Sequence, residues 1–370
     1  MAKSILHTRV CDFFRIRYPI FSAGMGGIVS PAGPELAGAV SEAGGLGVIG
    51  GAFVPPEELR KQIAQVREMT DKPFGVDTLI PFSVTKGNLD NPLKLDATLP
   101  AEHEEFLQMF GDKFDLGDLP QADIPIFDPA FIREQLECIL DCNVPVYVAG
   151  IGDPGFLITR AKEMNLDMKV GVVVGAVRHA EKSLANGVDF LVAQGNDGGG
   201  HNSTVGTMAL IPQVVDEVAG RVPVLGAGGI MDGRGMVAAL ALGADGVWLG
   251  SAFLATPEAR ITRGQKQVLI NTKETGTALS NAYSGKRARL IPGVYYDEFN
   301  NSGLDVLPMH QQLTFTDRIL KAADAQGRID VNPGVAGQGV GMIKKIRPAA
   351  EVLVSIADQA AGILEKGILG

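Results

Sequence analysis

The residues best suited to chemistry lie in one short stretch, 192–201, at the end of an apolar run that predicts a buried strand. Three consecutive glycines at 198–200 let the backbone turn tightly and approach a ligand with no side chain in between. His201 follows directly, and the C-terminal end of a parallel strand is where α/β barrels place their catalytic groups. The stretch indicates either a ligand-binding loop with a functional histidine or a glycine-rich turn beside a surface histidine.

Two further glycine turns could bind a phosphate. One reads Ala-Gly-Gly-Ile at 227–230 and the other Leu-Gly-Ser-Ala at 249–252, and each follows a predicted strand. In barrels, the loops after the last two strands commonly bind phosphate through backbone N–H groups. One such turn alone would be an ordinary loop, but two on adjacent strands predict a phosphate-bearing cofactor held by Gly228, Gly229, Gly250 and the hydroxyl of Ser251.

A third turn ends the first predicted strand and carries Ala23, Gly24 and Met25. Small residues there leave room for a flat ring system, and Met25 could pack against such a ring, although a methionine in the core is the alternative. Gln194 ends another strand and offers an amide donor and acceptor to the edge of a ring. These strand ends together predict a cup with His201 at its rim.

Eight short apolar segments, separated by amphipathic stretches, would position these turns. The predicted strands are 19–23, 45–49, 73–79, 144–149, 169–174, 188–193, 223–226 and 246–249. The predicted helices are 34–42, 55–69, 129–141, 154–165, 178–186, 208–219 and 234–242. Eight such units over about 250 residues predict an α/β fold, a (β/α)₈ TIM barrel, with a doubly wound open sheet as the alternative.

Two regions depart from this alternation. Residues 83–125 read as an inserted loop with a helical piece near 101–110, and residues 259–325 are polar and irregular. We expect 259–325 to form a small cap, inserted after the eighth strand and bearing on the substrate. The barrel would then comprise 1–258 and 326–370, and the amphipathic helix at 348–366 would supply its eighth helix.

Composition restricts the class of protein. The chain has 370 residues, 46% of them hydrophobic, and a net charge of −9 without a long basic block, which argues against nucleic acid as a partner. No apolar run reaches membrane-spanning length, and the start lacks a secretory signal pattern, so we expect a cytoplasmic protein. The three cysteines, Cys11, Cys138 and Cys142, suit a reducing compartment, and no metal-like cluster accompanies them.

At this point several ordered motifs resemble one family. The chain is similar to the nitronate monooxygenases (2-nitropropane dioxygenases), which share an FMN barrel with FMN-dependent enoyl-ACP reductases and some NADH:quinone reductases. The resemblance covers nearly the whole chain outside 83–125. It rests on the motifs at 19–26, 193–201, 227–235, 249–253, 282–286 and 336–339.

The resemblance implies an FMN-dependent oxidoreductase that oxidises alkyl nitronates with O₂ to a carbonyl compound and nitrite. The residues that would contact the flavin are Ala23, Gly24, Met25, Asp77, Gln194, Gly199 and Gly200, with Gly228, Gly229, Gly250 and Ser251 on its phosphate. His201 matches the family histidine, which is tied to substrate binding and to removal of the α-proton from neutral nitroalkanes. A neutral imidazole is a workable base at pH 7.

Three departures from the family pattern affect the pocket. The loop reads Asp-Gly-Gly-Gly-His at 197–201, where the family usually has Glu-Ala-Gly-Gly-His. Asp77 stands where many members place Asn, and its charge would disfavour anionic reduced flavin unless the acid is protonated or paired. The insertion 83–125 and the segment 292–308 would remodel the substrate pocket.

Two other functions fit the same motifs. The first is a reductase or dehydrogenase that uses NAD(P)H on enoyl-ACP or acyl-CoA thioesters or on quinones, in which His201 positions the substrate. Lys344, Lys345 and Arg347 are the basic residues that could face such a partner, or they form a solvated helix start. The second is a catalytically idle flavin-binding protein, against which His201 argues. The sequence also allows a homo-oligomer.

Overall fold

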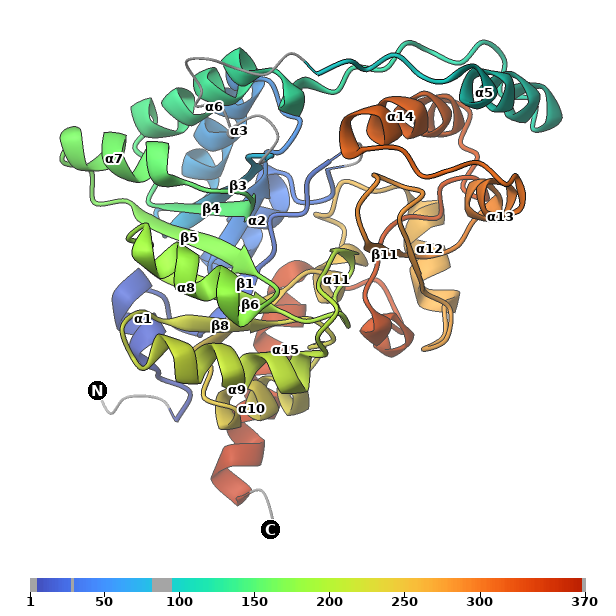
Figure 1. Ribbon diagram of the computed structural model, residues 1–370. Coiled ribbons are helices and arrows are strands. Elements are labelled where there is room, and N and C mark those ends of the chain that lie inside the picture. Colours follow the sequence, from blue (N-terminus) through green and yellow to red (C-terminus); the bar gives the residue numbers. More distant parts are fainter. Residues whose placement is uncertain (1–4, 28–29, 82–94, 368–370) are drawn as a thin grey trace.

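Eight parallel strands form the centre of the molecule. The computed structural model describes residues 5–27, 30–81 and 95–367. Within them the strands β1 (Ile20–Ser22), β2 (Gly47–Gly50), β3 (Phe74–Leu79), β4 (Val146–Ile151), β5 (Lys169–Val174), β6 (Phe190–Gln194), β8 (Val224–Ala227) and β9 (Gly246–Leu249) pair in the order β1-β9-β8-β6-β5-β4-β3-β2 (Figure 1). A parallel bridge between Phe21 and Leu46 joins β1 to β2 and closes the sheet. The predicted TIM barrel is confirmed.

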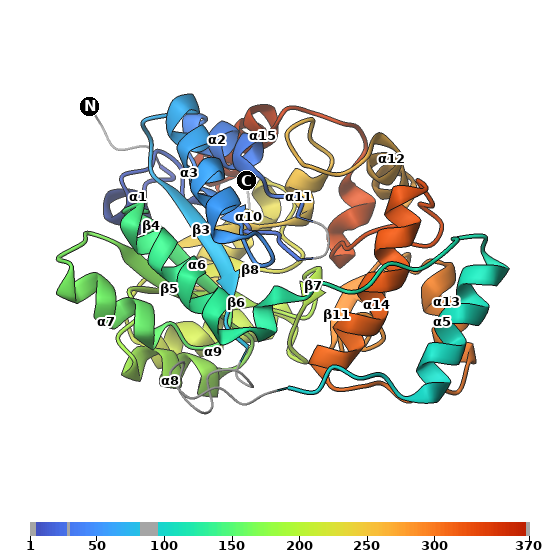
Figure 2. The same cartoon turned by 90° about the horizontal axis from the view of Figure 1, so that it is seen from above.

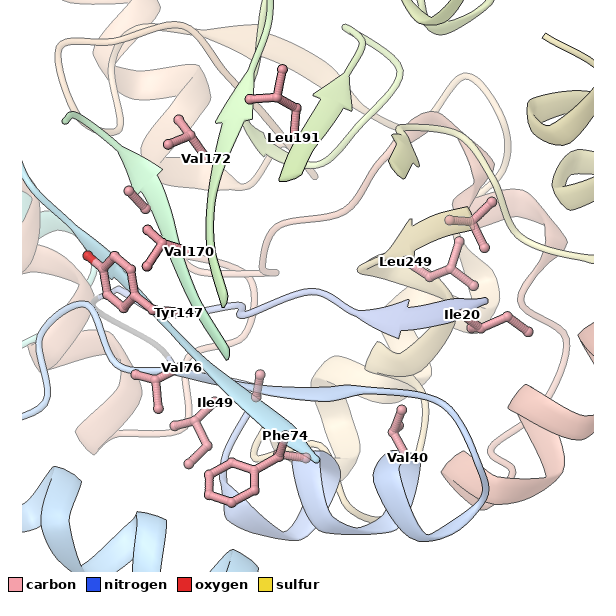
Figure 3. Packing of buried hydrophobic residues seen from close by; sticks show 14 of the residues in the cluster. Ile20, Val40, Ile49, Phe74, Val76, Tyr147, Val170, Val172, Leu191 and Leu249 are labelled. Carbon is pink, nitrogen blue, oxygen red and sulfur yellow. The ribbon is translucent and has the colours of Figure 1, made fainter. Parts of the chain in front are cut away.

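Helices surround the barrel, as the alternation predicts. They are α2 (Pro34–Glu42), α3 (Pro56–Met69), α6 (Pro129–Asp141), α7 (Gly155–Glu163), α8 (Val177–Ala185), α9 (Thr207–Val218), α10 (Gly233–Ala241) and α15 (Ala349–Lys366). The last of these packs against α10 and α2 and so takes the place of the eighth barrel helix. Side chains such as Val40 of α2 and Phe74 of β3 fill the layer between helices and barrel (Figure 3).

A short helix near the N-terminus, α1 (Arg9–Phe14), was not expected from the sequence. Its Phe14 ring meets the rings of Phe21 and Phe190 edge to face, with centroids 5.0 Å away in each case. These residues belong to the cluster of side chains that fills the barrel interior, which includes Val48, Val148 and Trp248. The interior is therefore a packed core rather than a channel.

A second group of elements covers one side of the barrel and follows β9. It contains α11 (Ser251–Leu254), α12 (Arg263–Asn271), β10 (Ala278–Ser280), β11 (Ala288–Leu290), α13 (Val294–Asn301) and α14 (Met309–Ala325), and Figure 2 shows it beside the barrel. The strands β10, β11 and β7 (Gly200–His201) form an antiparallel sheet. The glycine loop after β6 is thereby joined to this group.

Residues 83–94 of the predicted insertion 83–125 lie outside the described residues. Its helical piece is α5 (Ala101–Lys113), followed by the 3₁₀ turn η1 (Pro125–Phe127). The helix α5 packs on α14, and Phe106 and Phe110 share a buried cluster with Tyr295, Phe299 and Phe315. We propose that α5 belongs to the cap together with 259–325.

No helix in the described ranges is long and apolar enough to cross a membrane.

Candidate active site

A cavity of about 260 Å³ lies at the C-terminal ends of the barrel strands, between the barrel and the cap elements. All twelve residues that the sequence assigns to the site line it: Ala23, Gly24, Met25, Asp77, Gln194, Gly199, Gly200, His201, Gly228, Gly229, Gly250 and Ser251. They come from five different strand ends and the glycine loop, which the closed barrel brings to one face. Their individual roles remain predictions.

Three backbone N–H groups at one end of the cavity have no hydrogen-bond acceptor in the described part of the chain. They belong to Gly229, Gly250 and Ser251, whereas the Gly228 N–H points toward β9 in the parallel pairing of Ala227 with Trp248. Gly228 and Gly229 have φ angles of +102° and +70°, conformations that favour glycine. Unpaired N–H groups that converge on a cavity are suited to bind an anion, so this end fits the predicted phosphate.

Ser251 contributes more than the donor that was predicted. Its hydroxyl oxygen accepts a hydrogen bond from the Gly337 N–H at 2.8 Å, while its own proton stays available to a ligand. Gly337 lies just before the 3₁₀ turn η2 (Gln338–Met342) and also lines the cavity. The serine therefore ties the segment around 337 to the end of β9.

Small residues and Met25 form the floor of the cavity. Met25 is partly buried and packs against the cores on both sides, so it is a core residue that also lines the cavity. A Cβ on Gly24 would lie 2.2 Å from the Cβ of Asp77, and one on Gly26 would lie 2.8 Å from the Gly50 backbone. Only glycine fits at these two positions, and the floor stays flat for that reason.

The Gln194 side chain lines the cavity and also bonds to the protein backbone. Its Nε2 donates to the backbone carbonyl of His201 at 2.7 Å. Its Oε1 has no donor among the described residues, and Nε2 carries a second proton, so the amide can still offer a ligand an acceptor and one donor. The other amide proton fixes the glycine loop.

His201 is half-buried at the cavity wall and held on both its backbone and its side chain. Its backbone pairs with Ala288 of β11, and its Nε2 lies 2.7 Å from the hydroxyl oxygen of Ser284. The Ser284 hydroxyl also reaches the Lys286 carbonyl at 3.4 Å. If Ser284 donates there, it accepts from Nε2–H, which leaves Nδ1 as the acceptor of the ring.

Burial determines the protonation of this ring. Desolvation, assisted by the charge of Lys286, lowers the pKa of His201 to about 4. The imidazole is therefore neutral at pH 7 and available as a proton acceptor.

The surroundings of Asp77 bear on whether it carries a negative charge at the position where many family members have Asn. Its side chain is 7% exposed, and one carboxyl oxygen accepts the Gly150 N–H at 3.1 Å. No cation pairs with it in the described ranges, and burial raises the pKa of Asp77 well above its usual range. A protonated acid has the shape of the Asn amide and adds no negative charge to the cavity.

Sequence reasoning missed the residues that complete the wall. Tyr283 and Gly337 line the cavity, and Ser284 lies behind the wall as the partner of His201. All three lie in the motifs at 282–286 and 336–339, which signalled the family but gave these residues no role. Arg289 supports the loop from behind, since its Nε donates to the Asn196 carbonyl at 3.0 Å. Met309 and Leu313 of α14 close the cavity from the cap side, where the sequence gives no comparable signal.

Comparisons with known proteins agree with this geometry. A family model described as nitronate monooxygenase matches residues 7–359. A probable nitronate monooxygenase of Staphylococcus aureus is 31% identical over 373 residues, covering 96% of this chain and 98% of its own. A nitroalkane oxidase from Streptomyces ansochromogenes has a similar structure, with a TM-score of 0.79 at 28% identity over 96% of this chain and 99% of its own.

FabK from Thermotoga maritima is also similar, with a TM-score of 0.71 at 28% identity over 97% of this chain and 98% of its own. The matched span includes the barrel, the glycine turns and His201. The chain therefore belongs to the nitronate monooxygenase family, whose members are FMN-dependent oxidoreductases.

Proposed function

We propose that this protein binds FMN in the cavity and oxidises alkyl nitronates with O₂ to a carbonyl compound and nitrite. The observation that carries the proposal is the neutral His201, held by Ser284 on a wall of a cavity that also presents the unpaired N–H groups of the glycine turns. A flat, phosphate-bearing cofactor fits these features, with its phosphate at Gly228, Gly229, Gly250 and Ser251 and its ring over Ala23, Gly24 and Met25.

FMN, when bound, would supply the redox chemistry with the nitronate and with O₂. The protein side chains would bind, orient and exchange a proton. His201 would accept the α-proton of a neutral nitroalkane, because its ring is unprotonated at neutral pH. An anionic nitronate has already lost this proton, and it would need His201 only for binding.

The structure of Asp77 supports this assignment. Burial raises the pKa of Asp77 and so favours its protonated form, which could donate a hydrogen bond into the cavity without repelling an anionic substrate or cofactor. The cap side adds Tyr283, Met309 and Leu313, which present an almost wholly apolar surface to the alkyl part of a substrate.

A second candidate is an NAD(P)H-dependent reductase acting on enoyl or acyl thioesters or on quinones. The likeness to FabK at the same identity as the nitroalkane oxidase favours keeping it. In that reaction His201 would position the substrate and would not act as a base.

Anaerobic stopped-flow absorbance separates the two candidates. The purified, flavin-loaded protein is mixed separately with an alkyl nitronate, NADH and NADPH. We expect bleaching by the nitronate and recovery of the yellow colour on admission of air. Fast bleaching by a nicotinamide, with an inert nitronate, would reject nitronate oxidation in favour of the reductase.

Variants of the histidine test the role of the base. We expect His201→Ala to lower kcat/KM for a neutral nitroalkane by about 10²–10⁴-fold and for the nitronate by much less. Ser284→Ala keeps the imidazole but removes its partner, so the neutral substrate should lose about tenfold. His179→Ala, on the exposed side of α8, is the matched control. Equal losses with both substrates would show that His201 only binds.

A further inference from the structure

A second hollow of about 460 Å³ lies on the outer side of the segment that carries η2. It is bounded by α10, by α11 and by the chain between η2 and α15, and Figure 1 places α10 and α15 side by side. Met231 lines both this groove and the active-site cavity, and around η2 Gly337 and Gly339 line the cavity while Gly341 lines the groove. The groove therefore adjoins the end of the cavity that carries the glycine turns.

Four cationic side chains line the groove: Arg234, Lys344, Lys345 and Arg347. The chain as a whole carries a net charge of −9, so this concentration of positive charge runs against the composition. Lys344 and Lys345 are exposed, and neither has a carboxylate within salt-bridge distance anywhere in the described ranges. A surface of this kind attracts anions.

The acidic residues near the groove already interact with other groups of the protein. Asp232 is the one acidic residue that lines it, and its carboxylate caps α10 through the N–H groups of Arg234 and Gly235 and pairs with the Arg234 side chain at 2.6 Å. Glu351 lies 3.7 Å from Arg347. Glu258 accepts the Ala349 N–H at 3.1 Å. Lys344 and Lys345 thus supply the charge that remains free.

The floor of the groove is apolar. Met231, Met342, Ile343 and Val352 line it, and Met342 is 42% exposed. Methionine side chains adapt to flat rings, and lysines above such a floor suit phosphate groups. The combination matches a ligand that carries both a base and several phosphates.

We propose that this groove binds the adenosine-phosphate end of a soluble coenzyme, separately from the FMN site. Two coenzyme classes present this chemistry: a nicotinamide dinucleotide with a 2′-phosphate, and a coenzyme A thioester with a 3′-phosphate. Both carry a diphosphate and one further phosphate on an adenosine. This site goes beyond nitronate oxidation, which needs neither coenzyme.

Isothermal titration calorimetry on the full chain, with FMN in excess, tests the site with 2′,5′-ADP and 3′,5′-ADP as probes. We expect at least one probe to bind, and Lys344→Gln/Lys345→Gln to raise its Kd by about tenfold or more, since two charge-assisted contacts are lost. Binding should also weaken between about 0.05 and 0.3 M salt, as an electrostatic contact requires. The tighter probe identifies the coenzyme class.

Lys61→Gln/Lys72→Gln is the control, because it removes the same charge from exposed lysines on and after α3. Absence of binding to the wild type, or an equal Kd in the Lys344/Lys345 variant, would overturn the proposal. An equal loss in the control would overturn it as well, by reducing the effect to overall charge. Flavin absorbance reports separately whether FMN binds, so failure of the proposed function is read independently.

Discussion

The two halves of the cavity are built from different material. The barrel half presents mainly backbone, namely the glycine turns after β1, β8 and β9, and the turns after β8 and β9 carry the unpaired N–H groups. The cap half presents side chains, including Tyr283, Met309 and Leu313. Backbone geometry tolerates few substitutions, whereas a side chain on a helix can be exchanged for another. Cofactor binding and substrate choice are therefore separable in this molecule.

The largest effect is expected on the barrel half. Gly228→Ala places a Cβ 2.6 Å from the Thr207 hydroxyl oxygen at a φ of +102°. We expect it to lower the free energy of unfolding by roughly 2–4 kcal/mol and to abolish FMN binding. Urea unfolding and flavin titration measure the two effects.

Gly250→Ala is the matched control, because its φ is −96° and the new Cβ would meet its nearest neighbours at 3.6 Å. The free energy of unfolding should change little in this variant. A similar loss of stability in both would show that backbone strain at position 228 is not the cause.

A smaller effect, confined to substrate choice, is expected on the cap half. Met309→Ala enlarges the apolar wall of the cavity, so the ratio of kcat/KM for longer over shorter alkyl nitronates should rise by about tenfold. The Kd for FMN should stay within about twofold of the wild type, since we expect the cofactor to be held mainly by the glycine turns of the barrel. A change in FMN affinity without a change in chain-length preference would contradict the separation of the halves.

A pair of opposite pH dependences is expected from two residues that line the cavity, Asp77 and His201. Burial raises the pKa of Asp77 above its unfolded value of 3.8, so its contribution to stability is present below that value and is lost as the pH rises through the folded pKa. Asp77→Asn should flatten this decline. Burial lowers the pKa of His201 from 6.5 to about 4, so stability is present above 6.5 and is lost as the pH falls toward 4.

Urea unfolding at a series of pH values checks both slopes. As the pH rises, the free energy of unfolding of the wild type should fall relative to that of Asp77→Asn. As the pH falls, the free energy of unfolding of the wild type should fall relative to that of His201→Gln. Slopes of the same sign would be inconsistent with two buried neutral groups.

The barrel was predictable from the sequence because each strand is local. The runs at 169–174 and 246–249 are apolar, short and flanked by turns, and they became β5 and β9 with the predicted bounds. The twelve cavity residues were predictable for the same reason, since closing a parallel barrel brings all C-terminal strand ends to one face.

The cap was harder, because its contacts join residues far apart in the sequence. Ser284 reaches His201 across 83 residues, and α5 reaches α14 across about 200, with no local pattern that records either contact. Asp77 is a third case. Its residue type was visible in the sequence, but its protonation depends on burial among Gly24, Gly150 and the cavity wall.

The pairing of β7 with β11 limits which changes of the cap the enzyme can tolerate. Gly200 and His201 pair in register with Arg289 and Ala288, and neighbouring residues of a strand point to opposite faces of the sheet. A single-residue insertion or deletion between β10 and β11 that shifted this register would exchange the faces of Ala288, which lines the cavity, and Arg289, which binds the Asn196 carbonyl. A cap segment from another protein could therefore replace this one only if it preserved the register of β11 on β7. We expect the cap and the glycine loop to change together in evolution for this reason.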